Sequence, residues 1–257
     1  MKSVDYDAIA SAYDSRYAHR SYSGTREVLR RVVGQGVAGV TVEIGCGTGH
    51  WLRELAGATP LLVGIDLSWE MLVRARDRNT RFHLVRGDAA ILPFATASID
   101  RVLCVNVLHH IRDPPGFLRE CRRVLGVGGR FITIGLDPHT GSDAWWVYDY
   151  FPSARGIDLQ RYPATSRIRE LLTEAGFGGT ETEVAEHLTG AVPFAEAMAN
   201  GSVDRGATSQ LMVISDADYE SGLSRLTAVQ PVLRTDLRLF ATTGRVEGRS
   251  EREPATG

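Results

Sequence analysis

The chain has 257 residues, 43% of them hydrophobic, which is enough for one full hydrophobic core with or without a cap. Its 29 basic and 31 acidic residues give a net charge of -2, so no basic field favours a phosphate backbone and we expect no nucleic-acid partner. Three cysteines at unrelated spacings indicate neither a disulfide framework nor a metal site. No apolar run approaches the length of a membrane span and the first residues lack a signal core, so we expect a cytoplasmic protein that does not enter a membrane.

The first 34 residues are predicted to form a helical lid. Residues 5–33 read as helical, with a polar and aromatic first half and an amphipathic second half. Tyr6, Tyr13 and Tyr17 recur at helical spacing, which is typical of a packed face and also of a cover over a ligand. His19 in the same segment is a candidate general base.

A glycine-rich turn follows the first apolar run, and it contains an acid and three alternating glycines: Glu43, Gly45, Gly47 and Gly49. Glycine adopts positive φ and lacks a Cβ, so a ligand can lie against bare backbone near a helix N-terminus. The NAD fingerprint would need a glycine in place of His50, and the carboxylate would crowd a pyrophosphate. A carboxylate here prefers a cation. The expected ligand is therefore adenosine-bearing, phosphate-free and positively charged, which describes S-adenosylmethionine.

Three more polar residues end apolar runs further along the chain. Asp66 ends the run 61–66. A carboxylate at this position can accept hydrogen bonds from both hydroxyls of a ribose, in an S-adenosylmethionine site and in NAD enzymes alike. Asp88 ends a second run and can accept from an adenine amino group, and Asn106 follows the run 100–105. Because strands and helices alternate from 40 to 135, we expect a mostly parallel sheet with the ligand at the carboxyl ends of its strands.

As an ordered set, these motifs together with Leu92-Pro93-Phe94 and the segment 118–131 resemble the class I S-adenosylmethionine-dependent methyltransferases. Within that superfamily the resemblance is to the small-molecule, UbiE-like branch with methyltransferase domain 11 or 25. It implies an α/β fold with a Rossmann-like, seven-stranded, mostly parallel sheet, S-adenosyl-L-methionine as cofactor and S-adenosyl-L-homocysteine as product. The cofactor-binding residues that it implies are Tyr13, Glu43, Gly45, Cys46, Gly47, Gly49, Asp66, Leu67, Met71, Asp88, Ala89, Asn106 and Val107.

The predicted organisation has five segments: the lid (1–34), the cofactor-binding core (35–136), an aromatic-rich insertion that caps the acceptor (137–163), the remainder of the fold (164–242) and a disordered tail (243–257). In the fourth segment we expect helices at 165–176, 188–200 and 218–229, a sixth strand at 180–184 and a seventh at 211–214. The pair Trp145 and Trp146 either lines the acceptor site or anchors the insertion to the core.

Transfer of a methyl group from a sulfonium depends mainly on alignment and exclusion of water, although a base helps a hydroxyl or carbon acceptor. His109 and His110 follow the fourth predicted strand on the ligand side. Either one of them takes a proton from the acceptor, or the pair packs the following turn. His110 and His19 are the candidate catalytic residues, and no metal is expected because the acids lack metal-ligand spacing.

We therefore predict a monomeric or homodimeric enzyme that methylates O, N or C of a small-molecule acceptor. The Arg-rich, Ala- and Gly-rich composition favours a role in bacterial secondary metabolism. Three alternatives stay open. The opening Tyr6 to Ala10 resembles methyltransferases that modify a tRNA wobble base, the glycine turn admits an NAD-dependent oxidoreductase, and a non-catalytic cofactor-binding partner protein would share the same fold.

Overall fold

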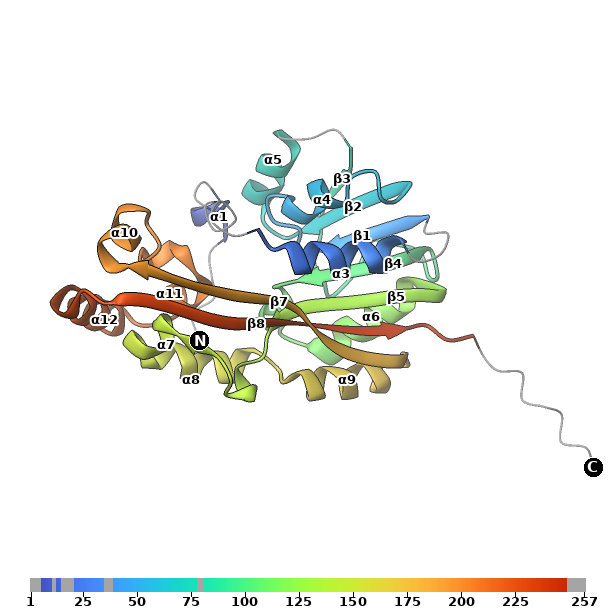
Figure 1. The fold of residues 1–257 in the computed structure, drawn as a ribbon. Helices are drawn as coiled ribbons and strands as arrows, with labels where there is room; N and C mark the ends of the chain where they lie inside the picture. The colour runs from blue at the N-terminus through green and yellow to red at the C-terminus, as the bar shows by residue number, and fades with distance from the viewer. Residues whose placement is uncertain (1–5, 11–12, 15–20, 35–38, 78–80, 249–257) are drawn as a thin grey trace, which may run out of the picture.

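The computed structural model describes residues 6–10, 13–14, 21–34, 39–77 and 81–248. Its centre is an eight-stranded sheet in the order β3-β2-β1-β4-β5-β8, in which β6 continues along the same edge of β8 as β5 and β7 pairs with the other edge (Figure 1). The strands are β1 (Val40–Ile44), β2 (Leu61–Asp66), β3 (His83–Arg86), β4 (Ile99–Val105), β5 (Leu125–Leu136), β6 (Ala144–Trp145), β7 (Gly178–Pro193) and β8 (Val232–Arg245).

The first five strands are parallel, as the alternation of strands and helices predicts. Glu43 of β1 is in register with Gly64 of β2 and with Leu103 of β4. Parallel neighbours need crossover connections, and these are α4 (His50–Leu55), α5 (Trp69–Asp77) and α6 (Pro114–Val124). The carboxyl ends of β1 to β5 therefore meet at one edge of the sheet, which is where ligands bind in open α/β folds.

Helices cover both faces of this sheet (Figure 1). On one face α3 (Ser23–Gly34) packs buried side chains such as Leu29 against β4 and β5, and α4 packs Leu52 against β2. On the other face α6 and α9 (Thr165–Glu174) bury Phe117 and Leu171. The Rossmann-like α/β fold is confirmed, and the sheet has eight strands instead of seven because of the two-residue β6.

A second core lies where β7 and β8 extend beyond the parallel strands (Figure 1). The short helices α7 (Trp146–Tyr150), α8 (Pro152–Arg161), α10 (Phe194–Ala199), α11 (Ser209–Val213) and α12 (Asp216–Val229) gather around this two-stranded extension. Trp145 and Trp146 are buried in this core, with 5% and 7% of their surfaces exposed. Of the two alternatives for this pair, the structure supports the one in which both anchor the insertion.

The predicted seventh strand at 211–214 is wrong, because α11 occupies that segment. Thr208 caps this helix by accepting a hydrogen bond from the N–H of Leu211. A short apolar run does not by itself distinguish a strand from a buried helical turn. The last strand is β8, which runs to Arg245, so the tail predicted from residue 243 begins too early.

Two predicted helices are only partly present. For residues 5–33 the structure has α1 (Tyr6–Ile9) and α3, with Tyr13 and Asp14 in a turn between them. For 188–200, β7 continues to Pro193 before α10 begins. The helices expected at 165–176 and 218–229 are confirmed as α9 and α12, and the strand at 180–184 is confirmed as part of β7. In the described ranges, every helix is too short or too polar to cross a bilayer.

The second core predicts a large effect for Phe151→Ala. The Phe151 ring is fully buried and fills the space beside Gly222. It stacks on the Tyr219 ring, with the two ring centroids 5.8 Å apart. Its removal should lower the free energy of unfolding by about 3–5 kcal/mol, measured by urea denaturation. Leu159→Ala on the same helix bundle, at a residue 39% exposed, is the control and should cost less than about 1 kcal/mol. Equal losses in the two variants would show that this second core is not tightly packed.

Candidate functional site

The glycine-rich turn after β1 lies directly at the carboxyl edge of the sheet. Gly45, Gly47 and Gly49 have φ angles of 67°, 53° and 77°, a region that favours glycine. A Cβ on Gly45 would lie 2.4 Å from the side chain of Val107, so glycine lets the turn pack against the second residue after β4. The buried Cys46 ties the turn to β2 because its N–H donates to the carbonyl oxygen of Ile65 at 3.0 Å.

The carboxylate of Asp66 joins this turn to the start of α5. One oxygen accepts from the N–H of Gly47 at 2.7 Å and the other from the N–H of Ser68 at 2.9 Å. Ser68 in turn caps α5, since its Oγ accepts from the N–H of Met71 at 3.1 Å. Burial raises the pKa of Asp66, and the backbone N–H groups oppose that rise. Two ionised oxygens offer about four acceptor sites, so the carboxylate keeps capacity for hydroxyl groups of a ligand.

Glu43 is buried under the same turn, with 1% of its surface exposed. Its Oε2 has no hydrogen-bond partner among the described residues. Burial, and to a smaller degree the nearby Asp66, hold the pKa of Glu43 well above its usual value, while Arg53 and a backbone N–H of α4 act in the opposite direction. A buried carboxyl group with an unsatisfied oxygen is costly, and a bound cation would relieve this cost.

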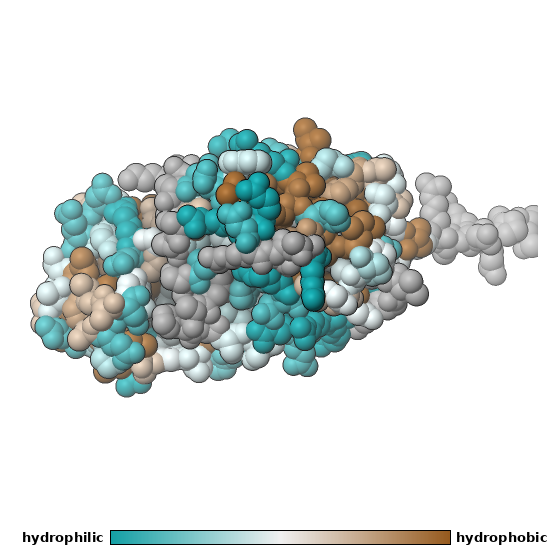
Figure 2. Space-filling view, turned by 90° about the horizontal axis from the view of Figure 1, so that it is seen from above, coloured by the Kyte–Doolittle hydropathy of each residue, from teal (hydrophilic) through white to brown (hydrophobic). Residues whose placement is uncertain are grey.

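Other predicted cofactor residues surround this turn. Asp88 is exposed and accepts from the N–H of Ala90 at 2.9 Å, and Ala89 is half-buried beside it. Leu67 is 64% exposed. Figure 2 shows hydrophobic side chains gathered on the half of the molecule that carries β1 to β3. Asn106 has a φ of 55° and its N–H donates to β5. Met71, in contrast, is only 1% exposed and belongs to the buried side of α5.

The N-terminal segment covers this edge of the sheet. On α1, Asp7 accepts hydrogen bonds from the hydroxyl of Ser68 and the N–H of Glu70 at the start of α5. A ring carbon of Tyr13 lies 3.6 Å from the Cβ position of Gly47, and Asp14 accepts from the hydroxyl of Thr48. Tyr13 therefore lies against the glycine turn. The other candidate base, His19, lies outside the described residues, as does Tyr17.

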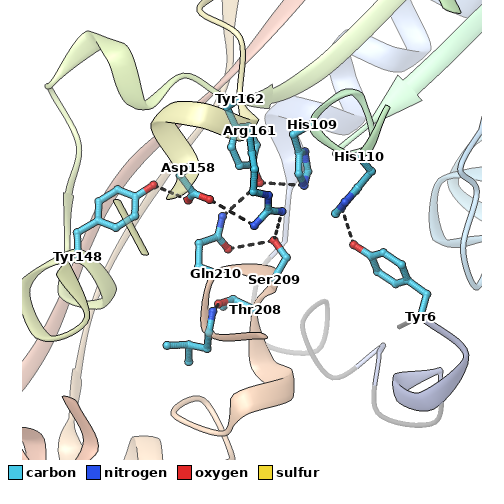
Figure 3. Close-up of polar contacts among 11 residues, drawn as sticks. Tyr6, His109, His110, Tyr148, Asp158, Arg161, Tyr162, Thr208, Ser209 and Gln210 are labelled. Atoms are coloured by element: carbon cyan, nitrogen blue, oxygen red, sulfur yellow. Dashed lines mark hydrogen bonds and ion pairs between the residues drawn. The ribbon is translucent and has the colours of Figure 1, made fainter. Parts of the chain in front are cut away.

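Two adjacent histidines follow β4 in the short helix η1 (Leu108–His110), and each contacts a tyrosine (Figure 3). The Nε2 of His110 lies 2.6 Å from the hydroxyl oxygen of Tyr6, and the Nε2 of His109 lies 3.1 Å from that of Tyr162. The two imidazole centroids are 3.9 Å apart. Burial holds the pKa of His109 well below its usual value, as do the charges of its neighbours, so this ring is neutral at physiological pH.

Behind His109 lies a buried polar cluster that the sequence did not reveal. Asp158 and Arg161 of α8 form an ion pair at 3.5 Å with both side chains at least 97% buried. Arg161 also contacts Ser209 of α11, and Gln210 contacts Tyr162 (Figure 3). The partners are up to 48 residues apart in sequence, so no local pattern indicates their contact. In the described part of the chain, no group of three or more His, Cys, Asp or Glu side chains is placed to hold a metal ion.

Comparison with known proteins identifies the family. A family model described as a methyltransferase domain matches residues 42–133. A demethylmenaquinone methyltransferase from Oceanobacillus iheyensis is 32% identical over 207 residues, which are 68% of this chain and 86% of that protein. A probable S-adenosylmethionine-dependent methyltransferase from Mycolicibacterium smegmatis is 27% identical over 199 residues, 76% of this chain and 71% of the relative.

The fold of solved methyltransferases agrees with this. A putative methyltransferase from an antibiotic biosynthesis pathway of Anabaena variabilis superposes with a TM-score of 0.64 at 19% identity, covering 84% of this chain and 95% of that one. The chain is thus an enzyme with S-adenosyl-L-methionine as its cofactor, and the alternatives of an NAD-dependent oxidoreductase and of a non-catalytic binding protein are wrong. By sequence and by fold, the chain belongs to the class I S-adenosylmethionine-dependent methyltransferases.

Proposed function

We propose that this methyltransferase acts on a small-molecule acceptor in bacterial secondary metabolism, at an O, N or C atom, with His110 as the general base. The observation that carries the proposal is the 2.6 Å contact between the Nε2 of His110 and the hydroxyl of Tyr6 at the carboxyl edge of the sheet. An imidazole that already binds one hydroxyl group at this edge is suited to bind an acceptor hydroxyl and remove its proton. A hydroxyl acceptor is therefore favoured over a nitrogen or carbon acceptor.

The residues around the glycine turn fit the cofactor. When bound, S-adenosyl-L-methionine supplies a methyl group that its sulfonium already activates. The free lone pairs of Asp66 suit the ribose hydroxyls, and the unpaired oxygen of Glu43 suits the ammonium group. The exposed apolar side chains of Leu67 and Trp69, next to Asp66, suit the faces of an adenine ring, and Asp88 suits its amino group.

Two further observations support a small-molecule acceptor. The names of the relatives mention demethylmenaquinone and an antibiotic biosynthesis pathway, which are both small-molecule chemistry. The net charge of -2 also disfavours a nucleic-acid substrate such as tRNA.

Asp66→Ala should abolish tight binding of the cofactor. The change removes the acceptors for the ribose and also those of two backbone N–H groups that shape the turn. The binding free energy for S-adenosylhomocysteine should weaken by about 3 kcal/mol, which is roughly a 100-fold rise in the Kd measured by calorimetry. Asp77→Ala, at an exposed residue that ends α5, is the control and should bind as the wild type does. Wild-type affinity in the Asp66 variant would contradict this assignment.

Glu43→Gln should have opposite effects on stability and on binding. Because the folded-state pKa of Glu43 is raised, the folded protein loses stability as pH rises from the unfolded pKa near 4.5 through the folded value. A neutral amide removes this loss, so the melting temperature of the ligand-free protein should rise by about 2–4 °C at neutral pH. Affinity for S-adenosylmethionine should fall, since the ammonium group loses its counter-charge. A variant with lower stability and unchanged affinity would contradict both roles.

His110→Gln tests the proposed base. Glutamine keeps a hydrogen-bonding group toward Tyr6 but does not take up a proton at neutral pH. Transfer of label from S-adenosylmethionine to a panel of hydroxylated aromatic acceptors should fall about 10²- to 10⁴-fold in kcat, with the Kd for S-adenosylhomocysteine unchanged. His83→Gln, at an exposed histidine of β3, should leave both values unchanged. An undiminished kcat in the His110 variant would rule out the base.

A further inference from the structure

A chain of polar side chains runs through the buried cluster from Arg161 to His109 (Figure 3). Its four links are Arg161 Nη2 to Ser209 Oγ at 3.4 Å, Ser209 Oγ to Gln210 Oε1 at 3.3 Å, Gln210 Nε2 to Tyr162 Oη at 3.2 Å, and Tyr162 Oη to His109 Nε2 at 3.1 Å. All five residues are buried. The chain joins the end of α8 and the following Tyr162 to α11 and η1.

Because the chain begins at Arg161, its hydrogen bonds all run from donor to acceptor in one direction, toward His109. A guanidinium group only donates hydrogen bonds, so the hydroxyl oxygen of Ser209 must accept from Arg161. The hydroxyl proton of Ser209 is then directed to the amide oxygen of Gln210. The amide nitrogen of Gln210 consequently faces Tyr162 and donates to its oxygen. The hydroxyl proton of Tyr162 is left to be donated to the Nε2 of His109.

The neighbouring carboxylate of Asp158 is compatible with this orientation of the Gln210 amide. Burial raises the pKa of Asp158, and a hydrogen bond from the Gln210 side chain opposes that rise more than any other group does. Only the amide nitrogen can act on a carboxylate in this way. Exchanging the nitrogen and oxygen atoms of Gln210 would remove the acceptor for the hydroxyl proton of Ser209 and the donor to Tyr162.

The last link determines the state of His109. Its Nε2 has to be an acceptor, so the ring is neutral and carries its proton on Nδ1. The titratable and charged groups that face this ring are His110 on the same short helix, and Tyr162 and Arg161 at the end of α8. Arg161 and a protonated His110 both disfavour a second positive charge on His109.

We propose that Arg161, Ser209, Gln210 and Tyr162 form a one-way relay that holds His109 as a neutral Nδ1–H tautomer and leaves His110 as the ring that takes up a proton. The four residues and His109 are positioning residues that act through His110. With centroids 3.9 Å apart, the two imidazoles do not both carry a charge in this site. This function of the relay rests on the proposed role of His110, whereas the tautomer of His109 does not.

Long-range proton–nitrogen correlation spectra of protein labelled with ¹⁵N-histidine test the direction of the relay. The wild-type spectrum should show His109 neutral and protonated on Nδ1, with its signals assigned by their loss in His109→Gln. In Gln210→Glu, examined at a pH at which the new carboxyl group is ionised, this group no longer donates to Tyr162 and accepts from it instead. The tautomer should then switch to Nε2–H, which donates to the tyrosine oxygen. A wild-type Nε2–H tautomer, or no change in the variant, would overturn the proposal.

A matched control separates the relay from general damage to the cluster. Tyr148→Phe removes a hydroxyl that donates to Asp158 at 2.8 Å but lies outside the relay. It should keep the Nδ1–H tautomer, so a switch in this variant would also overturn the proposal. If Gln210→Glu does not fold, Tyr162→Phe provides the second test. It removes the donor to His109 directly, and the loss of the pure Nδ1–H tautomer is expected.

The function of the relay is measured by methyl transfer to the hydroxylated aromatic panel. Gln210→Glu should lower kcat by about tenfold, the effect of one misplaced hydrogen bond, without a change in the Kd for S-adenosylhomocysteine. Tyr148→Phe should stay within about twofold of the wild type in both. An unchanged kcat in Gln210→Glu, when His110→Gln is impaired, would overturn the function of the relay. If His110→Gln is fully active, His110 is not the general base, and the tautomer of His109 remains the test of the direction of the relay.

Discussion

The site depends most directly on the contact of one carboxylate with two backbone N–H groups. Asp66, the last residue of β2, holds the turn after β1 through Gly47 and the start of α5 through Ser68. Because the strands are parallel, the segments after β1, β2, β3 and β4 all emerge at one edge of the sheet. This contact fixes the backbone of the glycine turn at that edge. The N-terminal segment lies over the turn, because Asp7 accepts a hydrogen bond from Ser68 and Tyr13 lies against Gly47.

Polar groups are buried on both sides of this edge, and each has a cost that the two cores must offset. Glu43 lies under the glycine turn with an unsatisfied oxygen, while Asp158 and Arg161 form a buried ion pair in the second core. Buried ion pairs contribute little net stability and often less than apolar side chains of similar volume. We propose that ligand binding accounts for the buried Glu43 and that the orientation of His109 accounts for the buried ion pair.

Much of the parallel half of the fold was predictable because its signals are local. The apolar run before the glycine-rich turn predicted β1, and the apolar runs that end in an acid predicted β2 and β3. The short apolar run at 211–214 was misread as a strand because its length and composition suit a helical turn equally well. Contacts such as Tyr6 with His110, 104 residues apart, and Arg161 with Ser209 depend on how distant elements pack. No spacing rule in one sequence encodes them.

A crystal structure of the protein with S-adenosylhomocysteine would show directly whether the carboxyl edge of the parallel strands binds the cofactor. We expect the ribose hydroxyls within hydrogen-bonding distance of the Asp66 carboxylate and the amino acid end of the ligand over Gly45 and Gly47. A ligand bound elsewhere on the molecule, or one that leaves the Asp66 side chain without a contact, would show that this edge is not the cofactor site.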